Sequence, residues 1–190
     1  MNKVLLKAAI VGGIIAFVWS IFSWGVIGWP KYIFQSFTNE EKVAEVIQSH
    51  AQVDGIYLLP NPYEKEGMNS KASKQNIFSK GPIVYATVVK HGLGDMRVSL
   101  VFSFISQLFT AYIIGWIVIR TKGNQYWPKV FYVTLIGGVV VSLLGIFPSY
   151  LWKGDSGLYV IISMVDYTIA WLLAGLAMIK IIGLTLNYKK

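Results

Sequence analysis

The chain has 190 residues, of which 55% are hydrophobic, with a mean hydropathy of +0.55 and a formal net charge of +8. This composition is typical of an integral membrane protein. The absence of cysteine excludes disulfides, thiolate metal sites, cysteine nucleophiles and lipoprotein acylation.

Apolar stretches of membrane-spanning length divide the chain. Four of them cover roughly residues 8–28, 98–119, 130–151 and 157–179. Each is about 20 residues long, enough for a helix to cross about 30 Å of hydrocarbon. We therefore predict an integral membrane α-helical fold, a four-transmembrane-helix bundle with a small α+β extracytoplasmic domain between helices 1 and 2. The expected domains are 1–29 for helix 1, 30–97 for the extracytoplasmic domain, and 98–190 for helices 2–4.

The distribution of charge predicts the orientation of these helices. The segments between helices 1 and 2 and between helices 3 and 4 carry nine basic and eight acidic residues, and the remaining acid, Asp166, lies within helix 4. The N-terminal segment, the segment between helices 2 and 3 and the C-terminal segment carry no acidic residue and eight basic ones: Lys3, Lys7, Arg120, Lys122, Lys129, Lys180, Lys189 and Lys190. Short loops rich in Lys and Arg stay in the cytoplasm, so we expect both termini there. The excess charge reflects this topology and attraction to anionic lipid, and nucleic acid is not an expected partner.

The first helix is expected to pack closely against another helix. One of its faces repeats small residues every four positions, namely Ala8, Gly12, Ala16 and Ser20. Such a face lets two helix backbones approach each other in a membrane. Trp24 and Trp29 are expected near the outer interface, where aromatic residues gather. Pro30 is expected to end the helix.

The segment between helices 1 and 2 predicts one helix and two strands. Thr38-Asn39-Glu40-Glu41 matches a capping box, which would begin an amphipathic helix that ends near Gln52. Gly55–Leu59 and Ile83–Lys90 are the predicted strands, and the polar residues 63–81 predict a long mobile loop. An isolated two-stranded sheet is marginally stable. We therefore expect it to pack on its helix, on the bilayer or on another protein.

Asp166 is the polar residue with the strongest indication of a role. It lies about nine residues below the outer end of helix 4, or roughly 14 Å, near the membrane midplane. A carboxylate at that depth costs several kcal/mol unless it is neutral, paired or hydrated. Gln107, Ser20 and Ser142 are predicted at a similar depth, so the four residues form a midplane polar layer, a candidate ion, proton or lipid site. The alternative is a structural hydrogen bond from Asp166 to Tyr112 or Gln107 that fixes helix packing.

The sequence predicts no catalytic residue, metal ligand or cofactor site. His50 and His91 are the only histidines, and their spacing resembles no metal motif. The Gly92-x-Gly94 pattern lacks the third glycine of a nucleotide-binding loop. Ser20 and Ser23 have no nearby base that would activate a hydroxyl nucleophile.

Several short strings carry a family resemblance. They are Phe17-Val-Trp-Ser20 with Ser23-Trp24, Gly55-Ile-Tyr-Leu-Leu-Pro60, Gly81-Pro-Ile-Val-Tyr85 and Asp166-Tyr-Thr-Ile-Ala-Trp171. Together they resemble a family of small uncharacterised four-helix bacterial inner-membrane proteins with a periplasmic insert between helices 1 and 2. The resemblance implies a multi-pass location in the bacterial inner membrane and implies no activity.

These features favour a non-enzymatic function. The leading hypothesis is an accessory or scaffold protein that binds another membrane protein or assembles with itself. The alternative is a small transporter, or a lipid- or ion-binding protein that uses the midplane polar layer around Asp166. An enzyme acting on lipid headgroups would need a cluster of acids and bases, which the sequence lacks. The expected partners are membrane lipids and either a membrane protein or a second copy of the chain.

Overall fold

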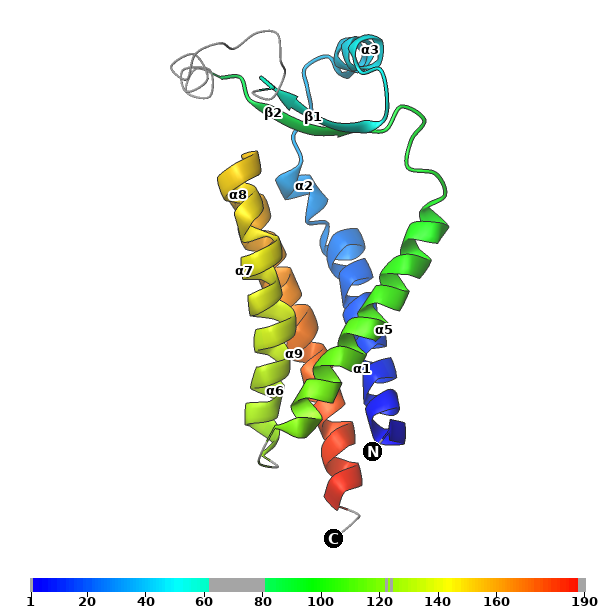
Figure 1. Ribbon diagram of the computed structural model, residues 1–190, viewed down its shortest axis with the longest axis vertical. Coiled ribbons are helices and arrows are strands. Elements are labelled where there is room, and N and C mark those ends of the chain that lie inside the picture. The colour runs from blue at the N-terminus through cyan, green and yellow to red at the C-terminus, as the bar shows by residue number, and fades with distance from the viewer. Residues whose placement is uncertain (1, 62–80, 122, 124, 188–190) are drawn as a thin grey trace. The chain divides into compact units, whose positions relative to one another are not determined.

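The computed structural model describes residues 2–61, 81–121, 123 and 125–187, and it is mostly helical (Figure 1). The chain forms two compact units. We call Met1–Phe34 with Asp95–Lys190 the helical unit, and Gln35–Gly94 the inserted unit. The predicted bounds of the insertion, 30–97, were a few residues wider at both ends. At the first end the chain from Pro30 to Phe34 groups with the helical unit, and at the second end the helix Met96–Arg120, with Asp95 as its N-cap, already belongs to that unit.

The helical unit contains four segments that are long and apolar enough to cross a membrane. They are Lys3–Ile27, Met96–Arg120, Tyr126–Lys153 and Gly157–Gly183. Each contains or overlaps one of the predicted apolar stretches, so the prediction of four membrane-length helices is confirmed. In Figure 1 the start of the first segment and the end of the fourth lie at one end of this unit, together with the end of the second segment and the start of the third.

The first segment does not end at Pro30 as predicted. Helix α1 (Asn2–Phe22) continues into η1 (Ser23–Ile27), a π-helical turn, which ends at Gly28 in the left-handed conformation with φ of +78°. A residue with positive φ favours glycine, because glycine has no Cβ to clash. Pro30 then begins a short helix, α2 (Pro30–Ile33). Proline is well suited to this first position, because its missing N–H would have no partner there in any case.

The remaining segments are one straight helix, one interrupted helix and one long helix. Helix α5 (Met96–Arg120) begins at Asp95, whose carboxylate accepts a hydrogen bond from the Arg97 backbone N–H at 2.9 Å. The third segment is a column of α6 (Tyr126–Thr134), the π-helical η2 (Leu135–Val140), α7 (Val141–Gly145) and α8 (Phe147–Lys153). Helix α9 (Gly157–Asn187) completes the unit.

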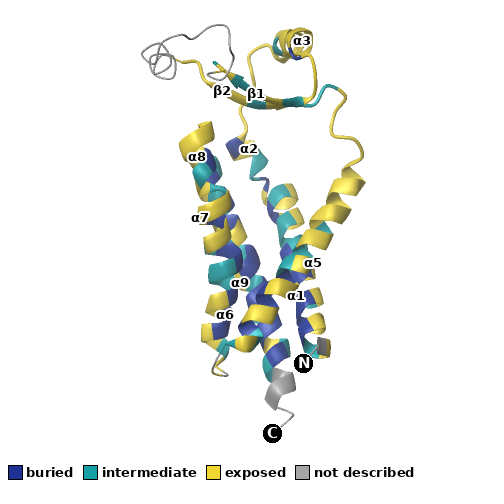
Figure 2. Cartoon of the chain, viewed as in Figure 1, coloured by how far each residue is buried: buried dark blue, intermediate teal, exposed yellow. Residues whose placement is uncertain are grey.

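The core lies where α1, α5, α6 and α9 come together. Helix α1 packs on α9 and α5, while α9 also packs on α6 and η2. Alanines contribute to this core together with larger apolar residues, and Ala8, Ala16, Ala111 and Ala174 are fully buried. Burial is not uniform along the helices, since residues 96–103 at the start of α5 are all exposed (Figure 2).

The inserted unit consists of α3 (Glu40–His50) and two antiparallel strands, β1 (Gly55–Leu59) and β2 (Val84–Val88). In the sheet Gly55 pairs with Val88, and Leu59 pairs with Val84. The predicted helix and strands are present, although β2 is shorter than Ile83–Lys90. The N-cap of α3 is Asn39, not Thr38, because the Asn39 side chain accepts a hydrogen bond from the Lys42 N–H at 2.9 Å. Nearly all of the predicted mobile loop, 63–81, lies outside the described residues.

Candidate functional site

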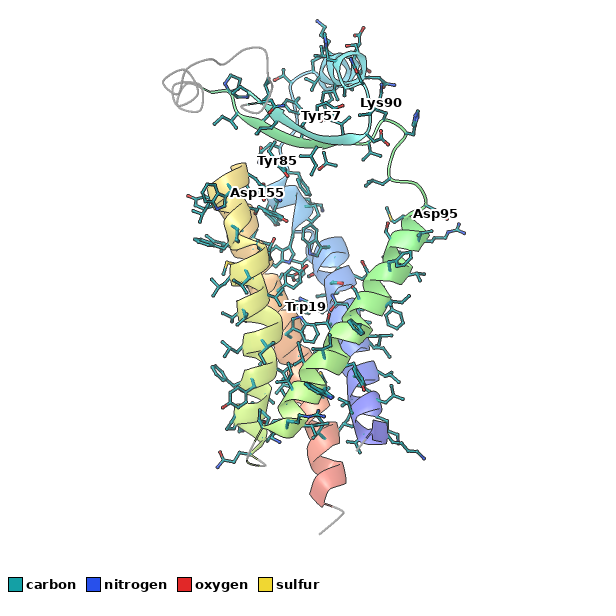
Figure 3. All side chains as sticks on the ribbon, viewed as in Figure 1. Trp19, Tyr57, Tyr85, Lys90, Asp95 and Asp155 are labelled. Atoms are coloured by element: carbon teal, nitrogen blue, oxygen red, sulfur yellow. The ribbon has the colours of Figure 1, made fainter. Side chains whose placement is uncertain are left out.

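Three tryptophans donate hydrogen bonds to the Asp166 carboxylate. The indole Nε1 of Trp19 lies 2.8 Å from Oδ1, that of Trp29 lies 3.3 Å from Oδ1, and that of Trp24 lies 3.1 Å from Oδ2. Asp166 is only 5% exposed. Trp19, labelled in Figure 3, lies within the bundle. The carboxylate is therefore held by donors that all come from the first membrane-length segment and the turn that follows it.

The irregular backbone at the end of this segment makes the three-indole arrangement possible. A regular α-helix would place residues 19 and 24 about 140° apart around its axis. The π-helical turn η1 begins at Ser23, between Trp19 and Trp24, and both indoles reach the same carboxylate. The left-handed Gly28 then turns the chain so that Trp29 reaches it as well. Single π-helical turns within α-helices occur frequently at functional sites.

The three indoles replace the counter-ion that the sequence does not provide. An indole N–H can only donate, and an ionised carboxylate can only accept, so the groups are matched. Hydrogen bonds to an ionised group are about twice as strong as neutral ones, and they offset the cost of removing the charge from water. The partners of Asp166 are thus tryptophans and not Tyr112 or Gln107, the partners proposed from the sequence. Trp24 and Trp29 are more than interface anchors.

A polar cavity of about 270 Å³ lies beside Asp166 and is lined by residues from all four membrane-length segments. Its polar lining comes from Asp166, Ser163, Tyr159 and Tyr167 of α9, together with Ser20, Ser103 and Gln107. Trp24, Trp171, Ala16, Ala170 and Ile146 complete the wall. The cavity has the mixed character of a ligand site, with apolar and aromatic walls and a few convergent polar groups.

The structure brings together three of the four residues in the predicted midplane polar layer. Asp166, Gln107 and Ser20 line the same cavity, although no hydrogen bond joins them within the described part of the chain. Ser20 instead donates to the Phe17 carbonyl oxygen at 2.9 Å. Ser142 is buried but is not among the cavity-lining residues.

Ser163 is a site residue that the sequence alone did not indicate. It is 3% exposed, lines the cavity, and its Oγ has no hydrogen-bond partner. The available signal was its position three residues before Asp166, since residues i and i+3 share one face of a helix. Serine is common in membrane helices, so this spacing alone did not distinguish it from Ser142 or Ser20.

A second hollow, of about 350 Å³, lies at the end of the helical unit away from the termini. It is lined by Ile33, Phe34, Asp155 and Ser156, and it shares Trp24 and Tyr159 with the cavity beside Asp166. Figure 3 labels Asp155 near α8. Trp24 and Tyr159 therefore line both the hollow at the end of the bundle and the polar cavity within it.

The predicted packing face of α1 faces the interior of the unit. Ala8, Gly12 and Ala16 are buried, and Ser20 is half-buried at the cavity. A Cβ on Gly12 would overlap the Met178 side chain of α9, so glycine is what lets the two helices come this close. Gly13, which the four-residue spacing omits, is more tightly confined, because its Cβ would lie 2.8 Å from the Leu108 Cα in α5.

The described residues contain no cluster of three or more His, Asp or Glu side chains that could hold a metal ion. Comparison with protein-family models, curated proteins and solved structures finds no match to the chain. The function is therefore argued from the residues and their geometry.

Proposed function

We propose that the chain is a multi-pass protein of a bacterial inner membrane, with both termini in the cytoplasm and the inserted unit outside. Four apolar segments of sufficient length support the membrane location. The even number of segments puts both termini on one side, the side that carries the eight basic residues and no acidic residue. The inner membrane is favoured by the family resemblance of the sequence.

We further propose that the protein is an accessory or scaffold protein that binds another membrane protein or assembles with itself. One observation carries this proposal: the described part of the inserted unit has almost no core of its own. Ala51 is its one buried residue. Phe37, Val46, Val53, Ile56 and Leu59 are all 58–68% exposed.

Such a unit gains little from the hydrophobic effect. Full burial of one Val, Ile, Leu or Phe side chain contributes about 1.5–3 kcal/mol, and most of this gain is not realised here. A two-stranded sheet is only marginally stable in water unless it packs on something else. Contact with a partner protein would bury these side chains and stabilise the unit at the same time.

Photocrosslinking from the exposed face of β1 tests this function. A photoreactive amino acid at Ile56, in the full chain in its native membrane, is expected to capture a single protein species, either a partner or a second copy. The matched control is position Glu45 on the polar surface of α3, where we expect little capture. Capture of lipid alone from Ile56, or equal capture from both positions, would contradict the accessory function.

A second function is favoured by the cavity beside Asp166. The Asp166 carboxylate accepts three hydrogen bonds, which hold it at the wall of the cavity. This cavity could bind a small polar ligand. In this alternative the protein is a ligand-binding or transport protein, and identifying the molecule bound in the cavity would show which class of ligand it takes.

A further inference from the structure

We propose that the cavity beside Asp166 binds a protonated amine, presented either by a small free molecule or by the headgroup of a membrane lipid. The proposal deepens the ligand-binding alternative and rests on it. It does not depend on the accessory function, which concerns the inserted unit.

Two unused acceptor groups face the cavity from one turn of α9. A carboxylate has about four acceptor positions on its two oxygens. Trp19 and Trp29 occupy Oδ1 and Trp24 occupies one position on Oδ2, which leaves about one position on Oδ2. The buried hydroxyl of Ser163 has no partner and lines the same cavity. A ligand that supplies N–H donors would complete both groups.

The charge of the lining favours a cation over an anion or a neutral ligand. Among the described residues that line the cavity and the adjoining hollow, there are two carboxyl groups, those of Asp166 and Asp155, and no Lys or Arg. A phosphate or carboxylate would therefore meet like charge with no compensating base. A protonated amine would pair with Asp166, where the low dielectric of the interior strengthens the attraction.

The walls and the size favour an organic amine over a bare metal ion. Trp24, Tyr159, Tyr167 and Trp171 place four aromatic rings in the wall, and aromatic rings attract ammonium groups through their quadrupoles. A volume of about 270 Å³ is several times that of one water molecule, roughly 30 Å³. A small metal cation would instead need a compact set of about six oxygen ligands. The cavity thus fits an ammonium group with a short carbon chain.

The hollow that contains Asp155 provides an entry. It shares Trp24 and Tyr159 with the cavity, so a cation attracted by Asp155 would pass these two side chains to reach Asp166. The same route would admit a lipid headgroup from the membrane surface at that end of the bundle.

Binding is measured on the purified full chain with three probes and two lipid environments. Butylammonium chloride is titrated in detergent while tryptophan fluorescence and melting temperature are followed, with butanol and sodium chloride as controls. In parallel, nanodiscs of phosphatidylglycerol with or without phosphatidylethanolamine are analysed for retained lipid by native mass spectrometry. We expect saturable binding of butylammonium, selective retention of phosphatidylethanolamine, or both, and which of them occurs identifies the source of the amine. Equal responses to butylammonium and butanol, a response to sodium alone, or no selectivity in either arm would overturn the proposal.

Two matched pairs of variants locate the binding in the cavity. Ser163→Ala is expected to raise the Kd for the amine about 3- to 10-fold by removing one acceptor. Ser142→Ala removes an equally buried and unpartnered hydroxyl outside the cavity lining, and should change the Kd less than about 2-fold. Ser103→Phe should block binding by filling the cavity from α5, whereas Ser106→Phe, on the same helix but outside the lining, should not. An amine Kd that is unchanged in both Ser163→Ala and Ser103→Phe would also overturn the proposal. Such a result would leave the crosslinking result at Ile56, which tests the accessory function, unaffected.

Discussion

The indole nitrogen of Trp19 in α1 lies 2.8 Å from Oδ1 of Asp166 in α9, and the bond joins residues 147 positions apart in the sequence. Helices α1 and α9 contact each other along the core through apolar residues. Such contacts are non-directional and do not by themselves fix how far one helix is rotated or shifted against the other. The bonds to Asp166 are directional, so they define that register.

Replacing Asp166 tests how much this register depends on the carboxylate. Asp166→Leu leaves three partly buried indole N–H groups without this acceptor, and we expect a loss of about 2–4 kcal/mol in unfolding free energy. Asp166→Asn keeps one acceptor oxygen and should lose about 1 kcal/mol. Melting temperatures in detergent should follow the order wild type, Asn, Leu. Val165→Ala, at an exposed neighbour on α9, is the control, and a Leu variant as stable as this control would exclude a structural role for the carboxylate.

The three tryptophans should not contribute equally. The donor-to-acceptor distances are 2.8 Å for Trp19, 3.1 Å for Trp24 and 3.3 Å for Trp29. Substitution by Phe keeps most of the ring and removes the donor. We expect Trp19→Phe to lower the melting temperature most and Trp29→Phe least. Trp152→Phe, at an exposed residue of α8, should have no effect, and an equal loss in all four variants would show that ring volume matters more than the hydrogen bonds.

The sequence predicted the helices well because their signal is a sum over many residues. Twenty apolar residues in a row identify a membrane-length helix regardless of any one of them. The strands and α3 were likewise predicted from local patterns. By contrast, the three-indole arrangement depends on one π-helical turn at Ser23–Ile27 and one left-handed glycine, Gly28. Neither has a reliable sequence pattern, so Trp24 and Trp29 were interpreted by the common tendency of tryptophan to lie at interfaces.

The cavity could be predicted only in part, for a similar reason. Depth along a helix follows from counting residues, and the count grouped Asp166, Gln107 and Ser20, which line one cavity. The direction in which a side chain points around the helix axis depends on how each helix is rotated in the bundle, and counting residues does not give that rotation. Ser142 follows the π-helical segment η2, which shifts the register of the third membrane-length segment, and it lies outside the cavity lining.

The cap of α3 offers a test within the inserted unit. The Asn39 side chain accepts a hydrogen bond from the Lys42 N–H, so Asn39→Ala should destabilise α3 by about 1 kcal/mol. Thr38→Ala should have little effect, although the capping-box pattern would assign the cap to Thr38. Amide hydrogen exchange measures the difference, at Lys42 for the Asn39 cap and at Glu41 for a Thr38 cap. Faster exchange of the Glu41 amide in Thr38→Ala than in the wild type would mean that the capping box forms after all.

The orientation of the helical unit can be tested because the chain contains no cysteine. Gln52→Cys lies in the inserted unit and Gln125→Cys lies at the start of α6, and both positions are exposed. With a membrane-impermeant maleimide on spheroplasts, we expect labelling at position 52 only. Position 125 should be labelled after permeabilisation. Labelling of position 125 in intact spheroplasts would contradict the proposed topology.

The packing of α1 should be more sensitive at Gly13 than at Gly12. A Cβ on Gly12 would meet the Met178 side chain, which is flexible and can move. A Cβ on Gly13 would lie 2.8 Å from the Leu108 Cα, so the backbones of α1 and α5 would have to separate. We expect Gly13→Ala to lower the unfolding free energy by about 1–3 kcal/mol and Gly12→Ala by less.

Gly25→Ala is the matched control for both, because no atom lies within 4 Å of the Cβ that it would add. Melting temperature and oligomer size in detergent, measured on all three variants, separate the outcomes. If Gly12→Ala destabilised the protein more than Gly13→Ala, the Met178 side chain would be unable to move aside. The contact between α1 and α9 would then contribute more to stability than the contact between α1 and α5. If neither variant differed from Gly25→Ala, the close approach of α1 to both of its neighbours would be excluded.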